Sequence, residues 1–367
     1  MTMTQTTLAS APIEGRSDDD LQRWLYENRR TDGLPVILPT AERIEEMLFA
    51  AALAGLDRDL ILGRVAPRMG EATVEKVAIN AVMAGCSPEY FPVVVAGVRA
   101  VCDDRLDMAA VQSTTHALSP LLIVGGPVAR ALEISGSYGA LGYGHRANLT
   151  IGRAIRLCLI NLGGGWPGFT DMTLLGNAGK LSACLTEHED SPYPPLHVSR
   201  GFSADQDVLT VVNVLAPHTL TCVLDGDDPD QHHRLLELVA RTITSPGNNN
   251  AVAGLGTVVV CLNLEHAQAL HAAGYTREDI QQEIFERAVN PYELARLNGK
   301  IPLVDEAPVD ANGNRRALTS PDDILVLVAG GPGAYSSVMM SWGYGTHGNI
   351  PIDVEIVTAD ECDVALA

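Results

Sequence analysis

The sequence has few basic residues, no closely paired cysteines and no long apolar run, and each shortage excludes a class of protein. Lys and Arg number 25 against 45 Asp and Glu, so the formal net charge is −20. A field of this sign repels phosphate backbones and anionic lipid surfaces. We therefore expect no nucleic-acid partner and no membrane partner.

The seven cysteines are odd in number and contain no CxxC pair. This pattern argues against a disulfide framework and a cysteine-rich zinc site, and it favours reduced thiols. Residues 1–20 are polar and lack the basic and apolar regions of a signal peptide. No segment reaches the ~18 uncharged apolar residues of a membrane helix. Together these absences predict a cytoplasmic protein.

Nucleotide and zinc fingerprints are missing as well. Residues 330–333 read Gly-Gly-Pro-Gly, without a Walker lysine and without the full GxGxxG spacing, and the chain has no HExxH. We expect no cofactor on this basis, and a divalent metal stays open.

The apolar residues that are present fall into uninterrupted runs. Residues 121–124, 257–262 and 324–328 are rich in Val, Ile and Leu, and each run leads into glycine or asparagine. Such runs are typical of strands in a sheet that is covered on both faces. Residues 207–215 and 108–111 are also expected to be strands. The predicted class is α/β, with a mixed or largely parallel sheet covered by helices.

Helical spacing of apolar residues recurs between these strands, and several segments begin with a capping residue. A chain of 367 residues, 46% hydrophobic, favours two closely packed halves over one core, since domains usually run ~100–200 residues. Helices are predicted over residues 41–54, 73–82, 88–102, 146–162 and 232–242, and after the N-cap Thr276.

The expected organisation is a polar N-terminal arm (1–32), an α/β half with most candidate site motifs (33–205) and a second α/β half (206–367). Trp24 and Tyr26 are expected to dock the arm. The second half contains a long loop, residues 290–321, rich in Pro, Asn and Gly. We interpret it as a surface excursion that could act as a lid, mobile without ligand.

The first candidate motif contains Glu71, Glu75 and Lys76. Four-residue spacing would place both carboxylates on one helix face, where a lysine can serve as a general base or a charge clamp. An exposed helix start of this composition also needs no function. Cys86 follows near the end of this helix and is either a nucleophile or a buried small apolar residue.

Two further motifs contain a histidine and an arginine. Residues 112–116, Gln-Ser-Thr-Thr-His, follow the expected strand 108–111, which makes His116 the best candidate for proton transfer and Thr115 a substrate contact. A capped loop histidine is the alternative. Arg146 and Asn148 begin an apolar helix after several glycines. A cation opposes the dipole there, so Arg146 is expected to face a carboxylate or phosphate.

The remaining candidates lie in two loops. Lys180 and His197 are candidate substrate contacts, and Gly331 with Ser336 belong to a glycine turn expected between a strand and a helix. A plain tight turn is the alternative. On a strand, the carboxylates of Glu187 and Glu189 would face the same way and form a weak metal site; a solvated acidic loop is the default.

Four stretches resemble the conserved body of the UGSC family of (seleno)proteins: RMGEATVEKVAINAVMAGCSPEYFPVV (68–94), QSTTH (112–116), GHRANLTIGRA (144–154) and SPYPPLHVSRG (191–201). The resemblance covers most of residues 33–220. It implies thiol or selenol redox chemistry, although the chain contains no CGSC that could supply the motif of the family name. It also places nine candidate residues within family-like motifs: Glu71, Glu75, Lys76, Cys86, His116, Arg146, Asn148, Lys180 and His197.

The leading hypothesis is an enzyme that acts on a small polar or anionic organic substrate by acid/base chemistry, as a lyase, hydratase or hydrolase. Glu71, Lys76, His116 and Arg146 are predicted to line one cavity. The alternatives are a thiol-dependent oxidoreductase that uses Cys86 or Cys184, and a non-catalytic protein that binds a small ligand. A homo-oligomer stays open.

Overall fold

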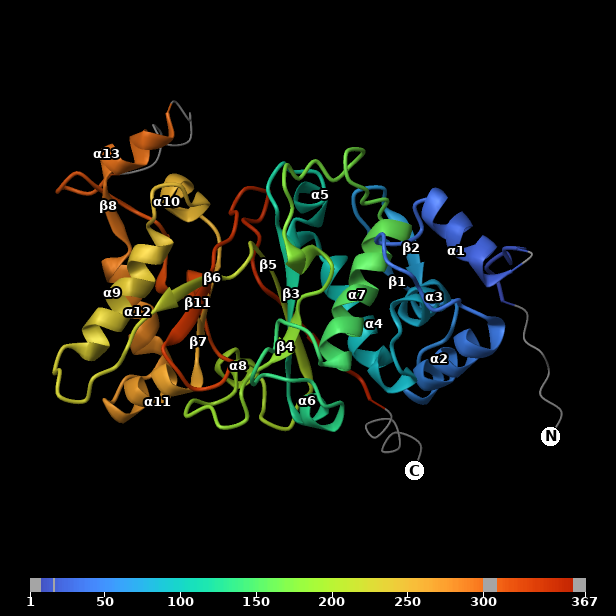
Figure 1. The fold of residues 1–367 in the computed structure, drawn as a ribbon, viewed down its shortest axis with the longest axis horizontal. Helices are drawn as coiled ribbons and strands as arrows, with labels where there is room; N and C mark the ends of the chain where they lie inside the picture. Colours follow the sequence, from blue (N-terminus) through green and yellow to red (C-terminus); the bar gives the residue numbers. More distant parts are fainter. Residues whose placement is uncertain (1–7, 16, 300–308, 359–367) are drawn as a thin grey trace.

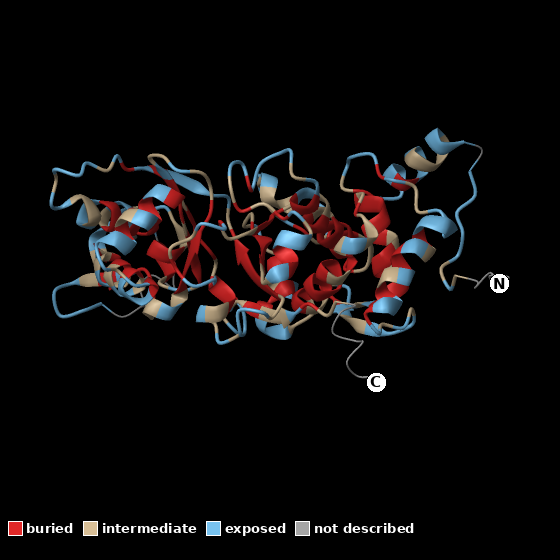
Figure 2. Cartoon of the chain, turned by 90° about the horizontal axis from the view of Figure 1, so that it is seen from below, coloured by how far each residue is buried: buried red, intermediate tan, exposed pale blue. Residues whose placement is uncertain are grey.

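The computed structural model describes residues 8–15, 17–299 and 309–358. Two four-stranded sheets stand face to face in the middle of the molecule, and helices cover the outer face of each (Figure 1). The predicted α/β class is therefore confirmed, with mixed sheets. Viewed from below, buried residues run through both sheets and the inner helix faces, while exposed residues cover the outside (Figure 2).

The first sheet has the strand order β12-β5-β3-β4. Strand β3 pairs in parallel with β4 and antiparallel with β5, which in turn pairs antiparallel with β12. Two of these strands lie beyond residue 205, so the second half of the chain completes the sheet of the first half. The bounds are β3 (Ser119–Gly125), β4 (Cys184–Thr186), β5 (Val208–Val214) and β12 (Ile352–Glu355).

The second sheet has the strand order β10-β7-β11-β6. Strands β10 and β7 are parallel, and β11 runs antiparallel to both β7 and β6. The bounds are β6 (His218–Thr221), β7 (Val258–Leu262), β10 (Ile324–Val328) and β11 (Tyr335–Met339).

The central strands are apolar throughout because both of their faces are covered. On β3, Leu122 and Val124 pack against the helices of the first half, while Leu121 and Ile123 face the second sheet. Alternate residues of a strand point to opposite faces, so a strand between two apolar layers needs apolar residues at every position. This packing explains the uninterrupted runs in the sequence.

The first sheet is covered by helices that begin at capping residues. The hydroxyls of Thr40 and Thr73 accept hydrogen bonds from the backbone at the start of α2 and α3, which confirms these predicted helix starts. The helices of this half are α1 (Asp18–Glu27), α2 (Ala41–Leu53), α3 (Val74–Ala84), α4 (Phe91–Val101), α5 (Met108–Val111), α6 (Pro127–Ala131) and α7 (Arg146–Asn161).

The second sheet is covered by α9, α11 and α12, whose apolar residues form one core with its outer face. Thr276 caps α12 in a capping box with Asp279, as expected for that N-terminus. The helices beyond α7 are α8 (Leu196–Ser199), α9 (Gln231–Ile243), α10 (Asn249–Ala253), α11 (Leu264–Ala272), α12 (Arg277–Arg287) and α13 (Tyr292–Ala295).

Three local predictions are wrong. Residues 108–111 form the helix α5 and not a strand, because Asp107 adopts a left-handed conformation and starts a new turn. The glycine turn at 330–333 leads into strand β11 and not into a helix. The predicted loop 290–321 contains α13 and a small sheet of β8 (Val289–Pro291) and β9 (Asn314–Arg316); residues 300–308 lie outside the described part.

The N-terminal arm is docked by residues other than those predicted. Trp24 and Tyr26 are 38% and 60% exposed, whereas Leu25 between them is buried. Helix α1 turns Leu25 inward and its two neighbours outward, since adjacent helical residues lie about 100° apart. Within the described part of the chain, no helix is long and apolar enough to cross a membrane.

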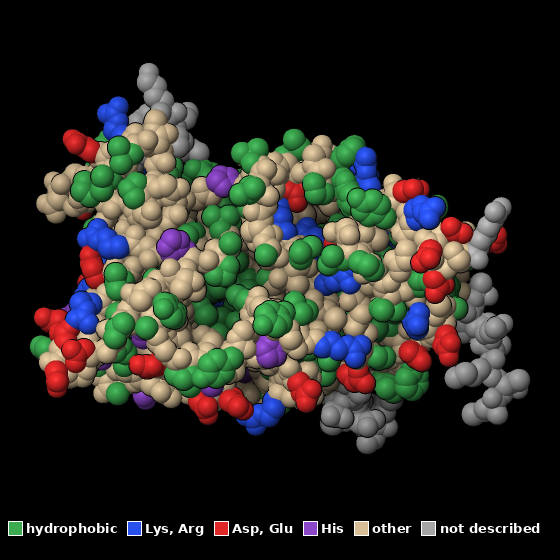
Figure 3. Space-filling model, in the orientation of Figure 1, with side chains coloured by type: hydrophobic (Ala, Val, Ile, Leu, Met, Phe, Trp, Pro, Cys, Tyr) green, Lys and Arg blue, Asp and Glu red, His purple; other side chains and the backbone are tan. Residues whose placement is uncertain are grey.

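A backbone hydrogen bond joins the segments that follow the two sheets at one edge of the sandwich. The backbone N–H of Leu215, just after β5, donates to the carbonyl of Met340, just after β11, at 2.8 Å. Helices α5 and α10, one from each half, lie at this same edge, at the top of Figure 1. The space-filling view shows the molecule hollowed between the two halves, with hydrophobic side chains in the hollow (Figure 3).

Candidate functional site

His116 lies where the two halves meet at this edge. It follows α5 and is half-buried, with its Nδ1 3.1 Å from the Nδ2 of Asn249 in α10. The ring of Trp342, in the segment after β11, lies 6.4 Å from the imidazole ring between centroids. Side chains from two segments that are distant in the sequence, α10 and the segment after β11, therefore lie beside this titratable imidazole.

The surroundings of His116 favour its neutral form. Burial lowers the pKa of His116 below its ordinary value of 6.5. The Asn249 amide makes no other side-chain hydrogen bond among the described residues, so it can donate to Nδ1 or, rotated by 180°, accept from it. Either tautomer can form, so Nε2 is able to give or take a proton.

A buried ion pair fixes the backbone of the His116 loop. Lys180 Nζ lies 2.9 and 2.7 Å from the two carboxylate oxygens of Asp171. The hydroxyl of Thr173 lies 2.6 Å from Oδ1 of Asp171 and 2.9 Å from the carbonyl oxygen of His116, and its single proton can be donated to either acceptor. Burial opposes ionisation of Asp171, but the hydrogen bonds from Lys180 and Thr173 outweigh it and hold its pKa below the usual range.

Arg156 lies beside this ion pair, on the buried side of α7. Its Nη1 donates to Oε1 of Gln112 at 3.1 Å, and its Nε donates to the carbonyl of Lys180. No carboxylate of the described residues lies within ion-pair distance of it, although the side chain is 6% exposed. Burial lowers the pKa of Arg156, yet a guanidinium stays charged in proteins.

Gln112 has an unused donor next to this cation. Arg156 can only donate, so the amide atom that it contacts is the oxygen and the other is Nε2. Nε2 is buried and has no hydrogen-bond partner among the described residues. Buried polar groups are almost always hydrogen-bonded, so an unpartnered donor beside an unpaired cation indicates a place for an anionic acceptor.

These side chains form one connected group that we call the junction cluster. Arg156 and Lys180 bring two positive charges and Asp171 brings one negative charge, which leaves one positive charge uncompensated. The cluster can therefore hold a small anion at Arg156 and Gln112, and its hydrogen bonds reach the backbone carbonyl of His116. Its members are Gln112, His116, Arg156, Asp171, Thr173 and Lys180.

Two of the predicted site residues belong to the junction cluster: His116 and Lys180. Thr115 precedes His116 and is exposed, and its carbonyl accepts a hydrogen bond from Leu174. Lys180 faces Asp171, so its role is to hold the loop that carries His116 and Thr173 in place.

Glu71 and Glu75 do not share a helix face, because Glu71 lies on β2 (Gly70–Thr73) and the helix begins after it. Glu71 forms an exposed ion pair with Arg64 on β1 (Ile61–Val65). Glu75 is buried and accepts hydrogen bonds from the backbone of the N-terminal arm at Ala9 and Ser10. Lys76 donates to the carbonyl of Glu71 at 3.2 Å.

Arg146 lies at the far end of α7 from the junction cluster. Ten residues separate it from Arg156, which at 1.5 Å per residue is about 15 Å of helix. Its Nη2 donates to the carbonyl of Gly85, the C-cap residue of α3, at 3.2 Å. The expected negative partner is therefore the carboxyl end of a helix, whose dipole favours a cation. The structure does not bring Arg146 together with His116.

Asn148 and Cys86 are buried near the first turns of α7, the end of the helix that carries Arg146. The side chain of Asn148 bonds the backbone of Ser135 in both directions and the carbonyl of Ala140, so it holds the loop before α7. The thiol of Cys86 donates to the carbonyl of Thr150, and burial raises its pKa to about 12.

His197 and the two glutamates occupy the opposite edge from His116. His197 is buried with its ring against Gly125, where a Cβ would lie 2.5 Å from Nδ1. Glu187 follows β4 and pairs with the buried Arg277, while Glu189 is exposed. They do not face the same way on a strand, and no group of three or more His, Cys, Asp or Glu in the described residues could hold a metal ion.

Ser336 is buried inside the second half, whereas Gly331 is half-buried and faces the first half. A Cβ on Gly331 would meet the ring of Tyr138, so the glycine allows the loop of the first half to approach. The hydroxyl of Ser336 lies 2.7 Å from Nδ1 of His266, and both side chains are buried.

Sequence reasoning missed Arg156, Asp171, Asn249 and Trp342. The signal for Arg156 was present: it is the one charge in the apolar stretch from residue 154 to 160, where a helix packed on a sheet should carry none. Asp171 and Asn249 sit in glycine-rich and asparagine-rich loops, whose convergence depends on how the two halves pack.

A large cavity, about 2220 Å³, lies away from the junction cluster, between the N-terminal arm and α2, and none of the cluster residues lines it. In the comparison with known proteins, no family model matches the chain, and no curated protein matches it.

Proposed function

We propose that the protein is an enzyme that acts on a small anionic organic substrate by acid/base chemistry, of the lyase, hydratase or hydrolase type. The observation that carries the proposal is Arg156, a buried cation that has no carboxylate of the described residues within ion-pair distance. It lies next to Nε2 of Gln112, which has no hydrogen-bond partner in the same part of the chain. A buried charge that is unpaired in the free protein is best explained by a ligand of opposite charge.

The roles follow from the chemistry of each side chain. Arg156 and Gln112 bind the carboxylate or phosphate of the substrate, where a guanidinium can make two parallel hydrogen bonds. His116, neutral at physiological pH, takes a proton from the substrate and returns it, with Asn249 supporting both tautomers. Lys180 and Asp171 position the His116 loop through Thr173. No step of this scheme requires a cofactor.

The resemblance to the UGSC family supports a second candidate, a thiol-dependent oxidoreductase. A catalytic cysteine needs a thiolate at neutral pH, which requires a lowered pKa. Burial instead raises the pKa of Cys86 to about 12 and raises that of Cys184 as well. The acid/base reading is therefore better supported. The acidic charge and reduced thiols support a cytoplasmic location for either enzyme.

A third candidate, a non-catalytic binding protein, differs only in whether bonds are broken. The test is proton exchange in D₂O, followed by NMR, with a panel of small hydroxy-, keto- and amino-carboxylates. The proposal expects wild-type protein to exchange a substrate hydrogen, the His116→Gln variant to bind but not exchange, and the Arg156→Met variant to do neither. Binding with equal exchange in wild type and His116→Gln would contradict it, and binding with no exchange in either would favour the binding protein.

A further inference from the structure

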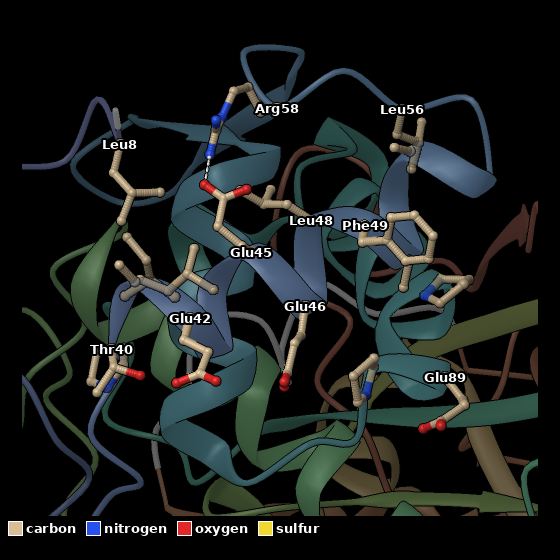
Figure 4. Close-up of a pocket in the computed structure, with 18 of the residues that line it drawn as sticks. Leu8, Thr40, Glu42, Glu45, Glu46, Leu48, Phe49, Leu56, Arg58 and Glu89 are labelled. Carbon is tan, nitrogen blue, oxygen red and sulfur yellow. Dashed lines mark hydrogen bonds and ion pairs between the residues drawn. The ribbon is translucent and has the colours of Figure 1, made fainter. Parts of the chain in front are cut away.

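The large cavity is an apolar groove on the outer side of the first half. The N-terminal arm forms one wall, including Leu8 and Ile13, and α2 forms another, with Leu48 and Phe49. Figure 4 shows Glu42, Glu46 and Glu89 along one side of this pocket and Phe49 with Leu56 on another. The groove thus combines an apolar wall with a row of carboxylates.

Helix α2 presents a regular stripe to this groove. Glu42, Glu46, Phe49 and Leu53 follow the spacing i, i+4, i+7 and i+11, which places them on one face of a helix. All four are exposed, and the two apolar side chains are 66% and 51% exposed. The opposite face of α2 packs into the core through Ile44 and Met47, so the stripe has no partner in the described residues.

The size of the groove favours a chain segment over a metabolite. Pockets for small molecules have volumes of about 300–1,000 Å³, whereas this cavity is about 2220 Å³. The stripe on α2 extends over three turns, from Glu42 to Leu53. Amphipathic helices bind in grooves of this kind through anchors at i, i+3, i+4 and i+7.

The charge of the groove selects the partner. Arg58 is the one Lys or Arg among its lining residues, and it is paired with Glu45 at 2.9 Å and lies 3.6 Å from Glu75. The carboxylates that line it without an ion pair to a described residue are Asp18, Glu42, Glu46, Asp57, Glu89 and Asp207. A groove of this sign attracts a cationic segment and repels an anionic one.

The same charge argues against two other occupants. A second copy of the chain carries a net charge of −20 and would bring further negative charge to the groove. Residues 359–367 of this chain contain three carboxylates and no Lys or Arg, so they are not complementary either.

We propose that this groove binds a basic amphipathic helix of a partner protein, with its lysines or arginines at Glu42 and Glu46 and its apolar anchors at Phe49 and Leu53. The proposal is independent of the junction cluster, because no cluster residue lines the groove.

The test is fluorescence anisotropy of the full chain with a fluorescein-labelled peptide of leucine and lysine, whose leucines repeat at i, i+3, i+4 and i+7. Controls are a scrambled peptide of the same composition and one with glutamate in place of lysine. The first variant is Phe49→Ser, matched by Val223→Ser, which is as exposed but lies after β6. The second is Glu42→Lys/Glu46→Lys, matched by Glu278→Lys/Glu286→Lys on α12, with the same change of net charge.

The proposal expects the amphipathic basic peptide to bind and both control peptides to bind at least tenfold more weakly. Each groove variant should weaken binding at least tenfold, while each matched control leaves it within twofold. Equal binding to the scrambled peptide, equal loss in the α12 variant, or no binding of the basic peptide at all would overturn it. So would a doubling of the solution mass that Phe49→Ser abolishes, since the groove would then hold a second copy.

Discussion

The guanidinium of Arg156 and the amide of Gln112 meet at 3.1 Å in the interior of the first half, with no carboxylate at ion-pair distance among the described residues. Most buried arginines are neutralised by a neighbour, because removing a cation from water costs several kcal/mol unless it is paired. Here the hydrogen-bond acceptors of Arg156 are two neutral oxygens, on Gln112 and on the backbone of Lys180, and Asp171 and Asp32 act on it only from beyond ion-pair distance. Among the described residues, no ion pair uses the charge of Arg156 to stabilise the fold. This charge is therefore available to a ligand.

The first prediction concerns the shape of this cation. Arg156→Lys keeps the charge but removes the planar fork, so it cannot bond Gln112, the Lys180 carbonyl and a ligand together. We expect the affinity for the substrate anion to fall at least tenfold, about 1.4 kcal/mol. One buried acceptor should also lose its partner, at a cost of about 1–3 kcal/mol in the free energy of unfolding. Calorimetric titration and urea denaturation measure the two quantities, and unchanged affinity would remove Arg156 from the site.

The second prediction concerns the pH dependence of activity. Burial lowers the pKa of His116 below 6.5, so kcat/KM should rise with pH through an inflection below 6.5 and then level off. Asn249→Asp would place a carboxylate at Nδ1, raise the pKa of His116 and move the inflection to higher pH. The matched control is Asn248→Asp, because Asn248 bonds the carbonyl of Thr242. Identical inflections in both variants would show that His116 is not the titrating base.

The same shift gives a sign for stability. Below pH 6.5 the unfolded chain binds a proton at His116 that the folded chain does not, so the free energy of unfolding falls as pH drops from 6.5 toward the folded pKa. Above pH 6.5, His116 is neutral in both the folded and the unfolded state. The free energy of unfolding then no longer changes with pH through this group.

The third prediction compares Glu71 and Glu75, which belong to the same candidate motif in the sequence. Glu75 is buried and holds Ala9 and Ser10 of the arm, so Glu75→Gln should lower the free energy of unfolding by about 1–3 kcal/mol and expose the arm to proteases. Glu71 forms an exposed ion pair, so Glu71→Gln should cost no more than about 1 kcal/mol. Denaturant titration and limited proteolysis of both variants make the comparison, and equal effects would contradict it.

The Glu75 contribution also depends on pH. Burial opposes ionisation, but the hydrogen bonds from Ser10 and Ala9 outweigh it and lower the pKa of Glu75 below 4.5. A lowered carboxyl pKa contributes stability that is present above 4.5 and is lost as pH falls through the folded pKa. The Glu75→Gln variant should therefore lose less stability than wild type over that range.

The fourth prediction separates the acid/base enzyme from the thiol enzyme. With its pKa raised to about 12, Cys86 should react slowly with iodoacetamide at neutral pH in the native protein. Cys86→Ala should retain turnover in the D₂O exchange assay. Fast alkylation that abolishes turnover would instead support the oxidoreductase.

The fold could be predicted further than the site. Apolar runs and capping residues mark most strands and helices locally, as in β3 and α12, because their signals lie within a few neighbouring residues. The prediction of a strand at residues 108–111 was wrong, because four apolar residues are compatible with either a strand or a short helix. The left-handed Asp107 decides in favour of the helix.

The site depends on contacts across the two sheets, which no local pattern contains. His116 could be singled out by its chemistry, but its partner Asn249 lies 133 positions away in the other half. Arg146 drew attention because it opposes the dipole of its own helix, yet the carboxyl end of α3 supplies its partner. The more informative arginine was Arg156, whose neighbours in the sequence are apolar.

The most direct measurement of the central claim is an anomalous-diffraction experiment on crystals soaked in sodium bromide, for wild type and for Arg156→Met. The account predicts a bromide peak that touches both the Arg156 guanidinium and Gln112 Nε2 in the wild type and is absent from the variant. Wild-type peaks confined to the surface, with Gln112 Nε2 bonded to protein or water instead, would contradict it.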